Sequence, residues 1–366
     1  MENQMQQYIE KEYEVLFDLI KNGKRNMKDI ADALSGSEPD RLVLVGSGSS
    51  YNACEIARPF MEKVLRREIT TVYPTKEIDL DSLNGERKLL IAVSQEGTSS
   101  NTIAFVKQHK QSFMTTIAAT AVHPCLLESF CDQHLLIACG NEMCGPKSLG
   151  VSATVVSLWI SAVELGLVWG TLSFERYEEL YKQLETVVSS IPECLLKSKD
   201  WVRKNTLTMK DARAIAVVGS DAVSGVVREA ALKLDETVYI QSTPYDFEEF
   251  IHGPFCVIGT DVHLYFLTQD EDNWQRMYQL IQFAREQKTP VFHVHIGNAD
   301  VPSDLRLGPD CKEYNSLLLL IPMQVICANI CIARGIDIDA NRYEELTNIM
   351  GSKLKTIMEE KCNEIY

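Results

Sequence analysis

The chain has 366 residues, of which 45% are hydrophobic, and it carries a formal net charge of −15 at pH 7. A chain of this length can bury a large core and is expected to divide into two or three domains. The acidic balance argues against a nucleic-acid partner, because a phosphate backbone needs a basic surface. The N-terminus is polar, and no run of eighteen apolar residues predicts a membrane span. We therefore expect a cytoplasmic protein with neither a nucleic-acid nor a membrane partner.

The eleven cysteines do not indicate a disulfide framework, because no CxxC pair occurs and most of them lie in apolar runs. Cys327 and Cys331 are four residues apart on an expected helix, which suits a buried pair of small apolar side chains. His293 and His295 alternate along an apolar run and would share one face of a strand. With no third ligand nearby in sequence, we expect reduced thiols and no metal.

The first half of the chain begins with a helical segment that extends through Leu34, and strands then alternate with helices. Such continuous apolar strands separated by helices are typical of parallel sheets that are covered on both faces. The predicted strands of this half are Leu42–Val45, Thr70–Tyr73, Leu89–Val93, Thr115–Ala119 and Leu135–Ala138.

A charged stretch from Phe174 to about Thr206, broken at Pro192, predicts a connector of two helices. The second half then repeats the plan of the first. The segments that begin at Arg41 and at Ala214 both contain an apolar strand, a Gly-Ser turn and a helix rich in small residues. The predicted strands of the second half are Ile215–Val218, Val238–Gln241, Val262–Leu267, Val291–Ile296 and a weaker Leu317–Leu320.

Two serine-rich loops in the first half are suited to binding an anion. Gly46-Ser47-Gly48-Ser49-Ser50 follows the first strand, and Ser94-Gln95-Glu96-Gly97-Thr98-Ser99-Ser100 follows the third. Backbone amides at a helix N-terminus bind phosphate, and hydroxyls add donors. A dinucleotide is disfavoured because Tyr51 replaces the third glycine of GxGxxG. Serine turns also serve as simple helix caps, so one loop alone would not distinguish an anion site from a cap. The pair favours a phosphate monoester.

A helix expected after Ala214 places Glu229, Lys233 and Glu236 on one face, because they are four and then three residues apart. His252 follows a predicted strand and an acidic turn, ahead of Gly253-Pro254. Charges at this spacing often form a solvated helix face. Ligands of open α/β sheets, however, bind at the loops after the strands. We therefore interpret these four residues as a candidate proton-transfer set.

The two loops, the block EAALKLDETVYI…EEFIHGP and the tail PMQVICANICIARGIDID together resemble the sugar isomerase (SIS) domains of the glucosamine-6-phosphate synthase family. The resemblance implies an α/β fold of two tandem SIS domains, each a flavodoxin- or Rossmann-like parallel sheet flanked by helices. The implied organisation is an N-terminal helical segment at 1–34, SIS domains at 35–170 and 207–350, a helical connector at 171–206 and a C-terminal helical tail at 351–366.

The same resemblance implies roles for individual residues. Glu236 matches the base that moves a proton between carbons 1 and 2 of the sugar, and Glu229 and Lys233 match its supporting pair. His252 matches the ring-opening histidine, which in that family comes from the neighbouring subunit. This implies a homodimer or higher oligomer with a shared active site. The phosphate-binding loops are matched by Gly48, Ser49, Ser50, Ser94, Gln95 and Ser99.

Three departures from the family pattern limit which of the family's functions and functional residues can be assigned to this chain. The chain has no glutaminase domain, so we do not expect it to take nitrogen from glutamine. Leu346 stands where the synthase places a tail lysine. Glu96 replaces a phosphate-binding serine, and one hypothesis is that it faces a cationic part of the substrate. Lys147, in the stretch from Glu142, is a further candidate for a sugar-binding loop.

A stand-alone pair of SIS domains with this Glu and His resembles the sugar-amine deglycases. These split 6-phosphorylated Amadori products, such as fructoselysine or glucoselysine 6-phosphate, into glucose 6-phosphate and a free amine. The resemblance implies no cofactor and a phosphorylated sugar-amine as the partner. The same residues would serve a phosphosugar aldose–ketose isomerase or an amino-sugar-phosphate deaminase. A non-catalytic sugar-phosphate sensor is the alternative from another class.

Overall fold

The computed structural model describes residues 2–75, 87–270, 274–340 and 342–354. The chain divides into two units, which we name by their sheets. The N-sheet unit comprises Asp18–Met143, Leu149–Tyr181 and Asn341–Tyr366. The C-sheet unit comprises Met1–Phe17, Cys144–Ser148 and Lys182–Ala340. Each is described below by itself.

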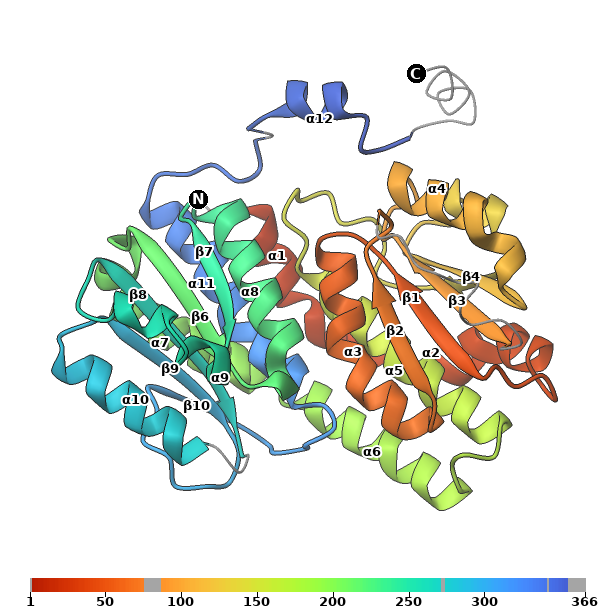
Figure 1. Cartoon of the computed structure of the whole chain (residues 1–366), viewed down its shortest axis with the longest axis horizontal. Helices are drawn as coiled ribbons and strands as arrows, with labels where there is room; N and C mark the ends of the chain where they lie inside the picture. Colours follow the sequence, from red (N-terminus) through yellow and green to blue (C-terminus); the bar gives the residue numbers. More distant parts are fainter. Residues whose placement is uncertain (1, 76–86, 271–273, 341, 355–366) are drawn as a thin grey trace. The chain divides into compact units, whose positions relative to one another are not determined.

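The N-sheet unit is built on a parallel sheet with the strand order β2-β1-β3-β4-β5 (Figure 1). Its strands overlap those predicted for the first half of the chain. Because β1 pairs in parallel with both β2 and β3, the carboxyl ends of β1 and β3 are neighbours at the same end of the sheet. The strands are β1 (Arg41–Val45), β2 (Glu68–Val72), β3 (Lys88–Val93), β4 (Thr115–Thr120) and β5 (Gln133–Leu136).

Helices cover this sheet because alternate strand side chains point to opposite faces. Val43, Val45, Leu90 and Ala92 share one buried cluster with Ile103 and Phe105 of α4. Helix α3 packs against α5 and also contacts β1, β2 and β3. The helices described in this part of the chain are α2 (Glu12–Ala33), α3 (Ser49–Leu65), α4 (Ser100–His109), η2 (Lys110–Ser112), η3 (Leu127–Phe130), α5 (Leu149–Val168), α6 (Phe174–Ser189) and α12 (Glu344–Met350).

The C-sheet unit repeats the plan of the first, with the strand order β10-β9-β8-β6-β7. Numbered along the chain within each unit, both sheets have the order 2-1-3-4-5, which is the flavodoxin-like arrangement. The strands are β6 (Ala214–Gly219), β7 (Ser242–Asp246), β8 (Val262–Gln269), β9 (Val291–Ile296) and β10 (Leu305–Leu307). The helices are α1 (Gln4–Glu10), α7 (Ile191–Lys210), η4 (Asp221–Val223), α8 (Ser224–Thr237), α9 (Phe247–Phe250), η5 (Pro254–Val257), α10 (Trp274–Glu286) and α11 (Asn315–Ala333).

The strand predicted at Val238–Gln241 is wrong. Val238 caps α8, and Tyr239 has a φ of +55°, outside the β region. The strand begins instead at Ser242, whose backbone N–H donates to Asp235 Oδ1 at 2.7 Å. The apolar character of this stretch reflects packing at the end of α8, because Val238 and Ile240 are buried.

The weaker strand predicted at Leu317–Leu320 is also wrong, because these residues lie inside α11. A short apolar run does not distinguish a buried strand from a segment of a buried helix. Here the apolar character continues through Ala333, which is too long for a strand of ordinary length. Helix α11 is a core helix that packs against α7 and α8.

Helices α5 and α11 are long and apolar enough to cross a membrane by length and composition alone. Their most apolar windows are, however, 89% and 78% buried inside the structure. Such burial is what the core helix of a sheet-based domain shows, so these helices are weak evidence for a membrane span.

The predicted helical segments are present: α1 and α2 lie before residue 34, and α6 and α7 occupy the connector, with Pro192 in the first turn of α7. The boundaries of the predicted domains stay predictions. Residues 355–366 of the predicted C-terminal helical tail lie outside the described residues.

Candidate functional site

The structure brings together the three charged residues predicted to share a face of helix α8. Lys233 Nζ lies 3.4 Å from Glu229 Oε1 and 2.6 Å from Glu236 Oε2. The spacing of four and three residues places all three side chains on one face, so the lysine forms an ion pair with a carboxylate on each side. The helix packs against β7 and α11.

Burial separates the roles of the two carboxylates. The side chains of Lys233 and Glu229 are each 3% exposed, whereas that of Glu236 is 38% exposed. Burial by itself would lower the pKa of Lys233, but the adjacent carboxylates Glu229 and Glu236 outweigh it and raise that pKa above its ordinary value. The lysine therefore stays charged and holds Glu236, the carboxylate that reaches solvent.

The buried thiol of Cys327 on α11 completes the surroundings of the lysine. Burial raises the pKa of this thiol to about 12, although nearby Lys233 acts to lower it. The thiol is therefore neutral at pH 7 and leaves the two carboxylates as the counter-charges of Lys233. The cluster thus pairs one ammonium, that of Lys233, with the two carboxylates of Glu229 and Glu236.

His252 is exposed in the turn after α9, where its backbone N–H donates to Glu249 O at 3.1 Å, and it precedes Gly253 with a φ of +147°. Asp246 caps α9 by accepting from the backbone N–H groups of Glu248 and Glu249. Within the described part of the chain, no hydrogen bond or ion pair joins the His252 side chain to the α8 cluster.

The first serine loop connects β1 to α3 in the N-sheet unit. Glycine is required at two of its positions: a Cβ on Gly46 would lie 3.0 Å from the backbone of Ser50, and Gly48 has a φ of +54°. Ser49 and Ser50 are the first two residues of α3. Their backbone amides belong to the helix N-terminus, where an anion is favoured.

The second serine loop connects β3 to α4 and contacts the first. Ser94 Oγ and Ser99 Oγ lie 2.9 Å apart, on either side of a turn closed by Gly97 N–H donating to Ser94 O at 2.8 Å. Asn101 Nδ2 donates to Ser47 Oγ at 2.9 Å and thereby joins the two loops. The predicted phosphate-loop residues thus lie at the carboxyl end of the sheet, in or just after the loops that follow two adjacent strands.

Glu142, which the sequence analysis named only as the start of a candidate sugar-binding stretch, also lies at this end of the sheet. It is 1% exposed, and its Oε2 accepts from Gly150 N–H at 2.9 Å and from Gln95 Nε2 at 3.4 Å. It therefore holds Gln95 over the start of α5, where Gly150 leaves room for the amide. Lys147, proposed from the same stretch, belongs to the Cys144–Ser148 segment of the C-sheet unit, where Gln324 Nε2 donates to Ser148 O at 3.3 Å.

Glu96 pairs with a cation of its own chain. Its Oε2 lies 2.8 Å from Lys353 Nζ. The segment that carries Lys353 is bonded to the loop through Leu354 N–H to Thr98 O at 2.8 Å and Ser100 N–H to Ser352 O at 3.1 Å. Leu354 is 5% exposed and packs into the core. The cation that faces Glu96 in this structure is Lys353, which offsets a carboxylate in the middle of the serine loop.

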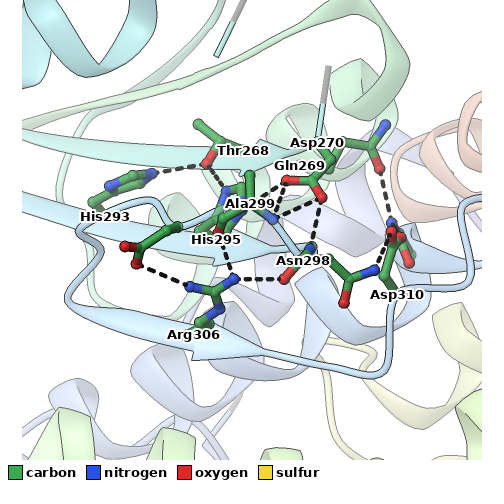
Figure 2. A network of polar contacts seen from close by, with 12 residues as sticks. Thr268, Gln269, Asp270, His293, His295, Asn298, Ala299, Arg306 and Asp310 are labelled. Atoms are coloured by element: carbon green, nitrogen blue, oxygen red, sulfur yellow. Dashed lines mark hydrogen bonds and ion pairs between the residues drawn. The ribbon is translucent and has the colours of Figure 1, made fainter. Parts of the chain in front are cut away.

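His293 and His295 share one face of β9, as predicted, and belong to a buried polar network (Figure 2). Thr268 Oγ1 lies 2.8 Å from a ring nitrogen of each, and His295 Nε2 lies 3.2 Å from Asp270 Oδ1. Burial lowers the pKa of both histidines, that of His293 to about 3. The two neutral rings form hydrogen bonds that fix the ends of β8 and β9.

Residues 37–164 match the family model of the SIS domain, so this part of the chain is a SIS domain. The curated relatives include isomerizing glutamine–fructose-6-phosphate aminotransferases. That of Caldanaerobacter subterraneus is 22% identical over 83% of this chain and 50% of its own length. That of Thermococcus kodakarensis is 23% identical over 89% and 54%. The chain thus spans about half the length of the curated relatives it matches.

Solved structures share the fold over nearly the whole chain. A candidate phosphosugar isomerase from Clostridium difficile 630 has a TM-score of 0.85 and 25% identity, covering 97% of this chain and 100% of that one. A candidate sugar-binding protein from Salmonella typhimurium LT2 has a TM-score of 0.78 and 26% identity, covering 89% and 100%. The fold of glucosamine-6-phosphate deaminase from Thermotoga maritima also matches, with a TM-score of 0.69 and 20% identity over 91% and 98%.

Proposed function

We propose that this SIS-domain protein cleaves a 6-phosphorylated Amadori product, of the fructoselysine or glucoselysine 6-phosphate type, to glucose 6-phosphate and a free amine. The observation that carries the proposal is the α8 cluster, in which buried Lys233 holds the half-exposed carboxylate of Glu236 at 2.6 Å. A carboxylate held in this way is a suitable general base with access to a ligand.

The reaction needs one proton transfer between carbons, one between heteroatoms, and one water. Glu236 removes a proton from carbon 1 of the open-chain ketosamine while oxygen 2 gains a proton from solvent, which gives an enolamine. Glu236 then gives a proton to carbon 2 while the nitrogen loses its proton to solvent, which gives an imine. Water then adds to the imine carbon, and the carbon–nitrogen bond breaks to release the amine and glucose 6-phosphate. Lys233 stabilises negative charge that develops on oxygen. His252 assists opening of the sugar ring.

The serine loops of the N-sheet unit hold the phosphate in this proposal. Gly48, Ser49 and Ser50 contribute a helix N-terminus, and Ser94, Gln95 and Ser99 contribute the second loop. Binding the remote phosphate positions the reacting carbons. The C-sheet unit is a second SIS domain in this account, which its repeated strand order supports. We also propose a cytoplasmic homodimer or higher oligomer, in which His252 completes the site of a neighbouring subunit.

Three other functions are supported by specific neighbours. The likeness to a candidate phosphosugar isomerase and to a glucosamine-6-phosphate deaminase supports an isomerase or a deaminase that uses the same residues. The likeness to a candidate sugar-binding protein supports a sensor without turnover. A helix cluster with an accessible carboxylate favours catalysis over binding alone.

The test is release of glucose 6-phosphate from a panel of 6-phosphorylated sugar-amines, with fructose 6-phosphate and glucosamine 6-phosphate included. We expect release from an amino-acid adduct by the wild type and its loss in Glu236→Gln. Turnover of only the simple sugar phosphates would overturn the deglycase in favour of an isomerase or deaminase. Binding without turnover of any compound would overturn the enzyme in favour of a sugar-phosphate sensor.

A further inference from the structure

Three metal-ligating side chains outside the proposed active site lie together in the N-sheet unit. One ligand atom from each of His123, Glu128 and His134 lies within 4.8 Å of the other two. His123 Nδ1 is 2.9 Å from Glu128 Oε2, and the two imidazole ring centroids are 4.9 Å apart. The first two residues follow β4, and the third lies on β5, paired with Ala118 of β4.

A hydrogen bond that His134 donates to Thr120 orients the ring of His134. The Thr120 hydroxyl donates its single proton to Val122 O at 2.8 Å. Its oxygen therefore accepts from His134 Nε2–H, which lies 2.8 Å away. This bond selects the tautomer in which His134 Nδ1 carries the lone pair. A hydroxyl or carbonyl on the far ring nitrogen is the usual companion of a metal-binding histidine.

The exposure of the residues also suits a cation. His123 is 58% exposed in its side chain, so this ring has room to adjust to an ion.

We propose that His123, Glu128 and His134 form a binding site for one divalent transition-metal ion, with Zn²⁺ the ion that fits best. Two imidazoles and one carboxylate are a set that Zn²⁺ accepts, and they leave a fourth position for water. Hard ions such as Mg²⁺ prefer oxygen ligands throughout and fit this set less well.

The site lies on the segment that supports the second serine loop. Leu127 N–H donates to Gly97 O at 2.9 Å, and Ala121 N–H donates to Gln95 O at 2.7 Å. The Cys125 side chain also fills the space beside Gly97, where a Cβ would lie 2.3 Å from its Sγ. An ion that joins the residues after β4 to β5 therefore stabilises the support of that loop.

The test uses the full-length chain freed of metal with EDTA and titrated with Zn²⁺ alone. We expect one ion per chain and a rise in the unfolding temperature, because the ion binds the folded state. Both effects are lost in the His123→Gln/His134→Gln double variant. Thr120→Val, which removes only the orienting bond, weakens binding by about tenfold. The control variant is His109→Gln, a histidine of α4 outside the site, which keeps wild-type binding.

Co²⁺ serves as a second probe, because it reports the ligand type through its absorption. The site predicts nitrogen and oxygen ligation without the near-ultraviolet band of a cobalt–thiolate bond, and the same spectrum in Cys125→Ser. The single variant His123→Gln changes only the exposed residue of the site. Its unfolding temperature in EDTA should equal that of the wild type, which checks that this variant is folded. The proposal is overturned if the wild type binds no ion, or if the double variant binds one with unchanged affinity.

Discussion

Lys233 is the residue whose removal should damage the α8 cluster most. Its ammonium is buried between two carboxylates, one of which, that of Glu229, belongs to a side chain that is only 3% exposed. A buried charge left without its partner is costly, because the desolvation penalty remains while the attraction is lost.

We predict that Lys233→Ala lowers the free energy of unfolding by about 3–5 kcal/mol. The matched control is Lys197→Ala, which breaks the exposed i,i+4 pair with Glu193 at 2.7 Å and should cost about 0–1 kcal/mol. Chemical denaturation of both variants at pH 7 measures the difference. Equal losses in the two variants would show that burial does not set the strength of the cluster.

Glu96 and Lys353 act as a pair in the second serine loop, so their substitutions should not be additive. Lys353→Ala should weaken the binding of inorganic phosphate by about tenfold, because the Glu96 carboxylate then repels the anion without the Lys353 ammonium to offset it. Glu96→Ser/Lys353→Ala should regain most of that affinity. Calorimetry on the four proteins of the cycle measures the coupling, with Lys107→Ala on α4 as a control. An equal loss in the single and double variants would refute the pairing.

At the scale of elements, the histidine network at the ends of β8 and β9 makes stability depend on pH. Burial is the main cause that lowers the pKa of His293 to about 3, below the ordinary value of 6.5. Between these values the unfolded chain binds a proton that the folded chain does not, so stability is lost as the pH falls through this window. The stabilising contribution is complete above about pH 6.5.

We predict that the free energy of unfolding of the wild type falls more steeply than that of His293→Gln between pH 6.5 and 4. The difference in slope should approach about 1.4 kcal/mol per pH unit, the contribution of one proton. Urea unfolding at several pH values measures both slopes. Parallel curves would mean that His293 does not titrate in this range.

Local patterns predicted most of the strands, because short runs of apolar β-branched residues favour strands in both halves of the chain. The two wrongly predicted strands come from apolar residues that pack at a helix end, at Val238, and inside a helix, at Leu317–Leu320, and the short strand β10 was not predicted. In both places burial against another element decided the structure, and a local pattern contains no information about that packing.

The candidate site also has one part that could be predicted from the sequence and one part that could not. The α8 cluster could be predicted because a helix brings positions 229, 233 and 236 together by its own geometry. The contacts of Gln95 with Glu142 and of Glu96 with Lys353 could not, since they join residues 47 and 257 positions apart. Nothing in either local sequence indicates its partner.

At the scale of the whole molecule, the two units repeat one strand order but carry different chemistry. The loops after β1 and β3 are rich in serine and glycine, whereas the helix after β6 carries the buried ion pairs. In our account Glu236 on that helix is the base, and the exposed His252 is available to another subunit.

We predict that mixing Glu236→Gln and His252→Ala subunits restores part of the activity that each variant lacks alone. A shared site predicts this rescue, because some pockets in a mixed oligomer receive both an intact Glu236 and an intact His252. Subunit exchange is confirmed separately with differently tagged chains. No rescue after full exchange would place both residues in a site made by one chain.

The central claim, proton transfer by Glu236, is tested most directly by running the cleavage in D₂O and locating deuterium in the product. Since the Glu236 side chain is 38% exposed, its proton should exchange with solvent, and the released glucose 6-phosphate should carry deuterium at carbon 2. Glu236→Gln should form this product about 10²–10⁴-fold more slowly. Product formed by Glu236→Gln at the wild-type rate would contradict the account.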